Sequence, residues 1–205
     1  MFQLDNRYNS LNHMVHQTIH EAKPLKLYNA LNIGYLRDVN KQSKRLKAYG
    51  YRIIPELTSR EYLNAYNPIS NKIIHISNGT DFTNGTDLQN NILNSTWGRS
   101  GSRRTNEEKL SLNSIKQMYP NASTTLIGHS LGAQYSNYIG TRDDKVLNYN
   151  PHLNFNSIVR PNVQNYRTSG DIVSMGAHNS NTKTLQSHEY DTHGLSNIKN
   201  ENIFI

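Results

Sequence analysis

The sequence predicts an α/β fold in which a central, mostly parallel β-sheet is flanked by helices. Apolar, β-prone runs alternate with runs of helical periodicity through the second half of the chain. In addition, the segment TLIGHSLGA at residues 125–133 places a Gly-x-Ser-x-Gly pattern between a strand-like run and a helical run. The 205 residues have the length of one domain, and no segment has the composition of a linker.

The first 50 residues are expected to form an N-terminal helical region of that single domain, which spans residues 1–205. Apolar residues recur at helical spacing over residues 10–22 and predict an amphipathic helix that Pro24 ends. Residues 25–50 predict a second, basic helical region that ends near Gly50.

Residues 51–118 are expected to supply two paired strands and two helices. Residues 51–57 read as a connector interrupted by a proline, and runs at residues 62–66 and 72–77 predict the strands. The other predicted segments are a helix over 87–96, a polar loop over 98–106 and a helix over 107–118.

Strands and helices alternate after residue 120. The predicted elements are a strand at 124–127, a helix at 131–139, strands at 145–149, 163–167 and 184–188, and a short helix at 194–200. Because parallel strands need crossover connections, this alternation favours a sheet with helices on both faces.

The Gly-x-Ser-x-Gly pattern predicts a nucleophile elbow at Ser130. Such a turn places the serine in a strained conformation at the carboxyl edge of the sheet, and Gly128 and Gly132 let strand and helix approach closely. The helix that begins at Leu131 would direct its positive end at a developing oxyanion. The alternative is an ordinary strand-to-helix turn with a buried serine.

A serine nucleophile needs a general base, and the base needs an orienting carboxylate. Asp171 is the predicted acid, because it follows the strand at 163–167 across a short turn and so belongs at the same edge as Ser130. Asp143 and Asp144 are rivals, but they precede a strand and therefore belong at the opposite edge.

His193 is the predicted base. It lies in a loop before a short helix and completes the chain order Ser, Asp, His. His188, which falls within a predicted strand, and His178 remain alternatives. His129 neighbours the nucleophile, but its side chain is expected to point away from it.

The oxyanion hole requires two preorganised N–H donors. One is expected from Leu131, the residue after the nucleophile. The other is expected from the loop after the strand at 72–77, where Gly79 lets the backbone turn inward and Thr80 offers an N–H and a hydroxyl. A glycine-containing turn without function is the alternative.

Five segments between residues 50 and 200 together resemble the class 3, fungal-type lipases of the α/β-hydrolase superfamily. They are IIPELTSREYLNAYNPISNKIIHISNGTD, TTLIGHSLGAQYSNYIG, VLNYNP, VQNYRTSGDIVSM and DTHGLSNI. The resemblance implies an α/β-hydrolase fold, a triad of Ser130, Asp171 and His193, and oxyanion donors at Thr80 and Leu131.

The sequence departs from that family at the oxyanion loop and at the lid. The family usually has a supporting arginine before the Gly-Thr pair, where this chain has Asn78. No long apolar lid is evident, and residues 91–105 are either a shortened lid or a plain surface loop.

The amino-acid composition limits the ligands, the partners and the cellular locations that are expected for this protein. The absence of cysteine excludes disulfides and cysteine-based metal sites, and no metal or cofactor is expected. A net charge of +7 favours contact with an anionic membrane surface, whereas the scattered basic residues give no reason to expect nucleic acid. The lack of a signal-like or membrane-spanning segment predicts an intracellular protein or one packaged in a virus particle. The oligomeric state is not indicated.

These features predict a serine hydrolase that cleaves carboxylic esters of lipids, as a triacylglycerol lipase or phospholipase A1 does. One alternative is an inactive hydrolase fold that serves as an interaction or structural module. Another is a short-chain esterase or thioesterase.

Overall fold

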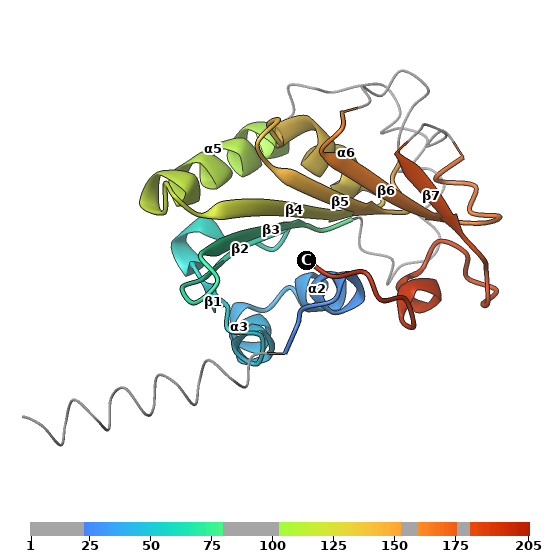
Figure 1. Ribbon diagram of the computed structural model, residues 1–205, viewed down its shortest axis with the longest axis horizontal. Coiled ribbons are helices and arrows are strands. Elements are labelled where there is room, and N and C mark those ends of the chain that lie inside the picture. The colour runs from blue at the N-terminus through green and yellow to red at the C-terminus, as the bar shows by residue number, and fades with distance from the viewer. Residues whose placement is uncertain (1–22, 80–102, 153–159, 176–180) are drawn as a thin grey trace, which may run out of the picture.

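One seven-stranded sheet, with its strands in the order of the sequence, forms the centre of the molecule (Figure 1). The computed structural model describes residues 23–79, 103–152, 160–175 and 181–205. Its strands are β1 (Arg52–Ile53), β2 (Tyr62–Asn67), β3 (Lys72–Ser77), β4 (Ser123–His129), β5 (Lys145–Tyr149), β6 (Val163–Thr168) and β7 (Thr182–Leu185). Its helices are α2 (Leu27–Gly34), α3 (Val39–Lys47), α5 (Arg103–Met118) and α6 (Leu131–Ile139), with 3-10 turns η1 (Pro55–Leu57) and η2 (Leu195–Ile198).

The sheet is antiparallel at one edge and parallel over the rest. β1, β2 and β3 pair antiparallel, whereas β3 through β7 pair parallel. α5 connects β3 to β4 and α6 connects β4 to β5, and right-handed crossovers place both on one face. α2 and α3 cover the opposite face (Figure 1). The predicted α/β-hydrolase-like sheet with helices on both faces is thus present.

Successive side chains of a strand point to opposite faces of the sheet, and this produces two hydrophobic cores, one on each face. Ile74, Ile76 and Ile127 pack with the helices α2 and α3. Their neighbours Ile73 and Leu126 point to the other face and pack with α5 and α6. Because the central strands are buried on both sides, their near-continuous apolar runs are explained by parallel-sheet geometry.

Most predicted strands and the helix after the elbow are confirmed, with α6 matching the prediction residue for residue. The helical region predicted over 25–50 is present and consists of two helices. The chain leaves α2 through Arg37, which has a φ of 50°, and Asp38 then caps α3 by accepting from the Lys41 N–H at 2.8 Å. An N-cap side chain of this kind starts a new helix.

Three further boundaries differ from the predictions. The segment at 51–57 contains β1 and η1, where we expected a plain connector. Residues 103–106 open α5, where we expected loop. The last strand occupies Thr182–Leu185, so it ends before His188.

Some predictions fall outside the described residues. These are the helix at 10–22, the helix at 87–96, Thr80, His178 and all but the last three residues of the segment 91–105. In the part of the chain that the structure describes, no helix is both long and apolar enough to cross a membrane.

Candidate active site

The polar residues singled out from the sequence gather where the parallel strands end. Strands β3 to β6 run in register, with Ser77 opposite Gly128, His129 opposite Tyr149, and Tyr149 opposite Tyr166. The segments that follow these strands therefore meet at one edge of the sheet. Ligands of α/β proteins commonly bind at this carboxyl edge.

Ser130 forms a tight turn between β4 and α6. Its φ of 54° and ψ of −123° lie outside the regions that residues with a side chain ordinarily adopt. A Cβ on Gly128 would lie 2.5 Å from the Ala133 Cα, and a Cβ on Gly132 would meet the Ser77 backbone. The geometry is that of a nucleophile elbow, in which strand and helix touch and the serine lies at the turn between them.

Ser130, His193 and Asp171 form one continuous chain of hydrogen bonds. Ser130 Oγ lies 2.8 Å from His193 Nε2, and His193 Nδ1 lies 3.0 and 3.1 Å from the two carboxylate oxygens of Asp171. A carboxylate only accepts, so Nδ1–H donates to Asp171 and Nε2 is left to accept from the serine hydroxyl. This is the tautomer in which a histidine acts as a general base towards serine.

The carboxylate of Asp171 is buried yet ionised. Burial by itself raises the pKa of Asp171, but the hydrogen bond and the charge of His193 outweigh it and hold the pKa below its ordinary value. The Val173 N–H adds a further hydrogen bond to Oδ1 at 3.1 Å. An ionised carboxylate here stabilises the positive charge that His193 acquires on taking a proton.

The loop that bears His193 is tied to the ends of β5 and β6. Asn150, with a φ of 41°, donates from Nδ2 to the Thr192 and His193 carbonyls at 2.9 and 3.1 Å. Its Oδ1 accepts from the Thr168 N–H at 2.7 Å. One asparagine side chain thus joins the loop of His193 to the first residues after β5 and to the end of β6.

His129 holds the same loop from a second side. Its Nε2 lies 2.9 Å from the His193 carbonyl and its Nδ1 lies 2.6 Å from the Tyr35 hydroxyl. A carbonyl only accepts, so Nε2–H donates to it and Tyr35 donates to Nδ1. Burial, with the charge of His193, lowers the pKa of His129 to about 3, so this ring stays neutral. As expected, its side chain points away from Ser130.

The oxyanion side of the site is described in part. Leu131 is the first residue of α6, so its N–H has no acceptor within the helix. Gly79 is the second residue after β3, and a Cβ there would lie 2.9 Å from the His129 carbonyl and 3.3 Å from the Ser130 Cβ. The glycine therefore brings the loop backbone against the elbow. Thr80, the other expected donor, lies outside the described residues.

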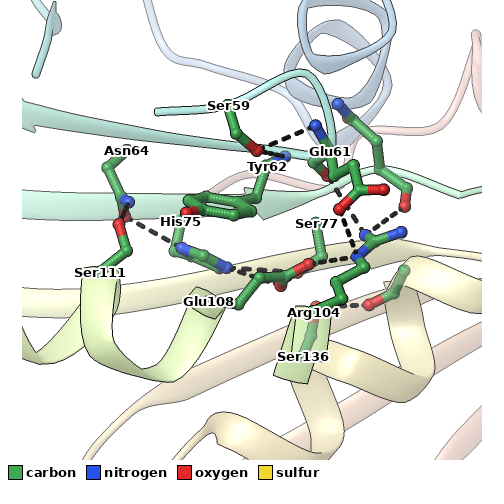
Figure 2. A network of polar contacts seen from close by, with 12 residues as sticks. Ser59, Glu61, Tyr62, Asn64, His75, Ser77, Arg104, Glu108, Ser111 and Ser136 are labelled. Atoms are coloured by element: carbon green, nitrogen blue, oxygen red, sulfur yellow. Dashed lines mark hydrogen bonds and ion pairs between the residues drawn. The ribbon is translucent and has the colours of Figure 1, made fainter. Parts of the chain in front are cut away.

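A buried polar network lies on the α5 face of the sheet, next to the end of β3 (Figure 2). The carboxylate of Glu108 on α5 contacts Ser77 Oγ, lies 3.2 Å from His75 Nε2 and accepts from Arg104 Nε at 2.6 Å. Burial alone raises the pKa of Glu108, but the His75 hydrogen bond and the charge of Arg104 outweigh it, and the pKa is lowered. Asn64 completes the network by accepting from His75 Nδ1 at 2.9 Å.

The alternative acid and base candidates do not reach Ser130 in the described part of the chain. Asp144 is buried at the far edge, where it pairs with Lys116 Nζ at 2.5 Å and accepts from the Thr141 N–H. Asp143 is exposed near the same edge. His188 is also exposed, and its N–H donates to the Asn197 side chain.

Several residues at the site were not singled out from the sequence. Tyr35 lies 94 positions before His129, and no local pattern connects the two. Asn150 lies within VLNYNP, one of the five segments that resemble the fungal-type lipases, so the sequence contained a signal that could have identified it. His152 is buried beside the elbow, where its N–H donates to the Ser130 carbonyl at 3.1 Å, and burial followed by the charge of His193 lowers its pKa.

Comparisons with known proteins returned fungal lipase structures. No protein-family model matches the sequence, and no curated protein matches it significantly. Among solved structures, Lip2 lipase from Yarrowia lipolytica is 15% identical over 72% of each chain, with a TM-score of 0.45. A mutant form of MDLA from Penicillium cyclopium is 14% identical over 92% of this chain and 84% of its own, with a TM-score of 0.49.

The Rhizomucor miehei lipase propeptide complex is 14% identical over 78% of this chain and 60% of its own, with a TM-score of 0.42. With identities this low and TM-scores below 0.5, the likeness concerns the fold. The chemistry of the site has to be inferred from its own residues.

Proposed function

We propose that this protein is a serine hydrolase that cleaves carboxylic esters of lipids through an acyl-enzyme. The observation that carries the proposal is the unbroken contact from Asp171 through His193 to Ser130 Oγ on a strained elbow. Nucleophile, base and orienting carboxylate at these distances are the minimum that acyl transfer to serine requires.

In the proposed reaction, Ser130 Oγ attacks the ester carbonyl while His193 Nε2 takes its proton. The tetrahedral oxyanion is bound by the N–H of Leu131 and by Thr80, our second proposed donor. His193 then gives the proton to the departing alcohol, which leaves the acyl group on Ser130. Water, activated by the same histidine, attacks the acyl-enzyme and releases the carboxylic acid.

The lipid class of the substrate is supported by two features. The ordered motifs resemble the fungal-type lipases, and the net charge of +7 suits a protein that works against anionic phospholipid.

The test is ester hydrolysis by the wild type and by Ser130→Ala on short-chain esters, long-chain esters and phospholipid vesicles. We expect loss of the nucleophile to lower kcat by more than about 10⁴-fold. Ser114→Ala is the matched control, because that hydroxyl only bonds a carbonyl within α5 and lies far from the triad.

The substrate preference in this test distinguishes a lipase or phospholipase, a short-chain esterase and an inactive fold. Preference for long chains or vesicles supports a lipase or phospholipase, and activity restricted to short soluble esters supports an esterase. A wild type that hydrolyses none of these esters, and whose Ser130 resists a fluorophosphonate, contradicts the proposal and favours an inactive fold used as an interaction module.

A further inference from the structure

His129 lies at the centre of a chain of hydrogen bonds that joins the loops on either side of the nucleophile. The Gly79 N–H donates to the Tyr35 hydroxyl at 3.1 Å, and this hydroxyl lies 2.6 Å from His129 Nδ1. His129 Nε2 lies 2.9 Å from the His193 carbonyl. The chain thus runs from the loop after β3, through the end of β4, to the loop that bears the proposed base.

The hydrogen bonds of this chain have a defined direction. A carbonyl oxygen only accepts, so His129 Nε2 carries the proton and Nδ1 accepts from the Tyr35 hydroxyl. The Gly79 N–H occupies one lone pair of the Tyr35 oxygen, which leaves the hydroxyl hydrogen directed at Nδ1. Tyr35 therefore favours the tautomer of His129 that donates to the His193 carbonyl.

The His193 carbonyl accepts hydrogen bonds from two donors. Asn150 Nδ2 donates at 3.1 Å from just after β5, and His129 Nε2 donates at 2.9 Å from the end of β4. Because a peptide group is rigid, two donors on one carbonyl restrict the orientation of the backbone at His193. The side chain on that backbone has Nδ1 3.0 Å from Asp171 and Nε2 2.8 Å from Ser130 Oγ.

The ring of His129 also packs against the ring of the base. The centroids of the His129 and His193 rings are 5.0 Å apart, and Tyr149 stacks on His129 at 5.5 Å. His193 becomes positively charged when it takes the serine proton. Burial and then the charge of His193 lower the pKa of His129 to about 3, so the neighbouring ring is neutral and does not repel that charge.

We propose that Tyr35 and His129 are positioning residues for the base, which hold the His193 backbone so that Nε2 stays directed at Ser130. This inference rests on the proposed function. Both residues act through His193. Tyr35 is the C-cap of α2, on the face of the sheet opposite to α6, so this early helix contributes to the geometry of the catalytic base.

The first test is Tyr35→Phe in the full chain, which removes the hydroxyl and keeps the ring that packs edge-on against His129. We expect kcat on p-nitrophenyl butyrate to fall about tenfold and KM to change less than about twofold, because the lost hydrogen bond orients the base and not the ester. The rate constant for reaction of Ser130 with a fluorophosphonate should fall by a similar factor. Tyr66→Phe is the matched control, because its hydroxyl donates to Asn71 Oδ1 at 3.0 Å in the turn before β3, at the opposite end of the strand.

The second test distinguishes the hydrogen bond of His129 from its packing. His129→Gln keeps an N–H for the His193 carbonyl, and we expect its kcat to stay within about threefold of the wild type. His129→Leu keeps an apolar side chain of similar size without a donor, and its kcat should fall about tenfold. Recovery of activity by the amide is not expected if His129 only fills space.

The outcomes separate this inference from the proposed function. An active wild type whose kcat is unchanged in Tyr35→Phe and His129→Leu overturns the positioning role. An equal effect of Tyr66→Phe, a change in KM as large as that in kcat, or a His129→Gln as impaired as His129→Leu also contradicts it. If the His129 variants do not fold, Tyr35→Phe decides alone. A wild type that neither hydrolyses esters nor reacts with a fluorophosphonate refutes the proposed function itself, and the positioning role with it.

Discussion

Among the residues that do not touch the substrate, Asp171 is the one that we propose to have the largest effect on kcat. Its carboxylate accepts a hydrogen bond from His193 Nδ1, which fixes both the tautomer and the orientation of the ring. Burial raises the pKa of Asp171, but the hydrogen bond and the charge of His193 outweigh it and lower the pKa. An amide in this position would offer a donor to the ring and reverse the tautomer that accepts from Ser130.

We therefore expect Asp171→Asn to lower kcat about 10⁴-fold. Asp143→Asn is the control, because Asp143 is one of the two rival acids in the sequence and is exposed near the opposite edge. Steady-state kinetics on the best ester found for the wild type measures both. If Asp171→Asn kept a tenth of the wild-type rate, Asp171 would not be the orienting acid.

At the scale of elements, the contact between β4 and α6 determines the shape of the elbow. Gly128 and Gly132 stand where the two elements touch, and Ser130 takes a φ of 54° between them. The strain in this turn is maintained because the strand is buried on both sides and cannot shift without disturbing two cores.

Gly128→Ala should accordingly destabilise the fold by about 3 kcal/mol, since its Cβ would meet Ala133 backbone. Gly170→Ala is the comparison: its φ is 83°, but a Cβ there would meet only a Thr192 methyl group at 3.7 Å, so we expect a loss of about 1 kcal/mol. Urea unfolding of both variants gives the difference. A loss at Gly128 no larger than the loss at Gly170 would show that the contact between β4 and α6 relaxes around a methyl group.

For the whole molecule, the buried ionisable groups make stability depend on pH. The pKa of His129 is about 3 in the folded protein and about 6.5 when unfolded. Between these values the unfolded chain binds the proton and the folded protein does not, so stability is lost as pH falls below about 6.5. Glu108 and Asp171, whose pKa values are also lowered, add to the loss in more acidic solution.

His129 alone should reduce the free energy of unfolding by about 2 kcal/mol between pH 7 and pH 5. In His129→Gln, which keeps a donor for the His193 carbonyl and an acceptor for Tyr35, this part of the pH dependence should disappear. Urea unfolding at both pH values provides the measurement, with His188→Asn, an exposed histidine, as the control. A variant as sensitive to pH as the wild type would show that His129 is protonated in the folded state.

Elements with local signals could be predicted from the amino-acid sequence. The run around Ser130, the apolar strands and the short turn between β6 and Asp171 depend on neighbours a few residues apart, so Ser130 and Asp171 could be predicted from them. His193 was predicted from the chain order Ser, Asp, His. Strands β3 to β7 run parallel and in order, so the residues that follow their carboxyl ends meet at one edge of the sheet whatever the loops contain.

The distant side chains that surround these three residues become visible in the folded protein alone. Tyr35 reaches His129, Arg37 and Arg104 reach the loop after β3, and Glu108 reaches His75, each across tens of positions of the chain. No periodicity marks such pairs, because they form where two packed layers meet and not along one element. The division of residues 25–50 into two helices has the same origin, since the turn at Arg37 is stabilised by the Gly79 carbonyl that it contacts.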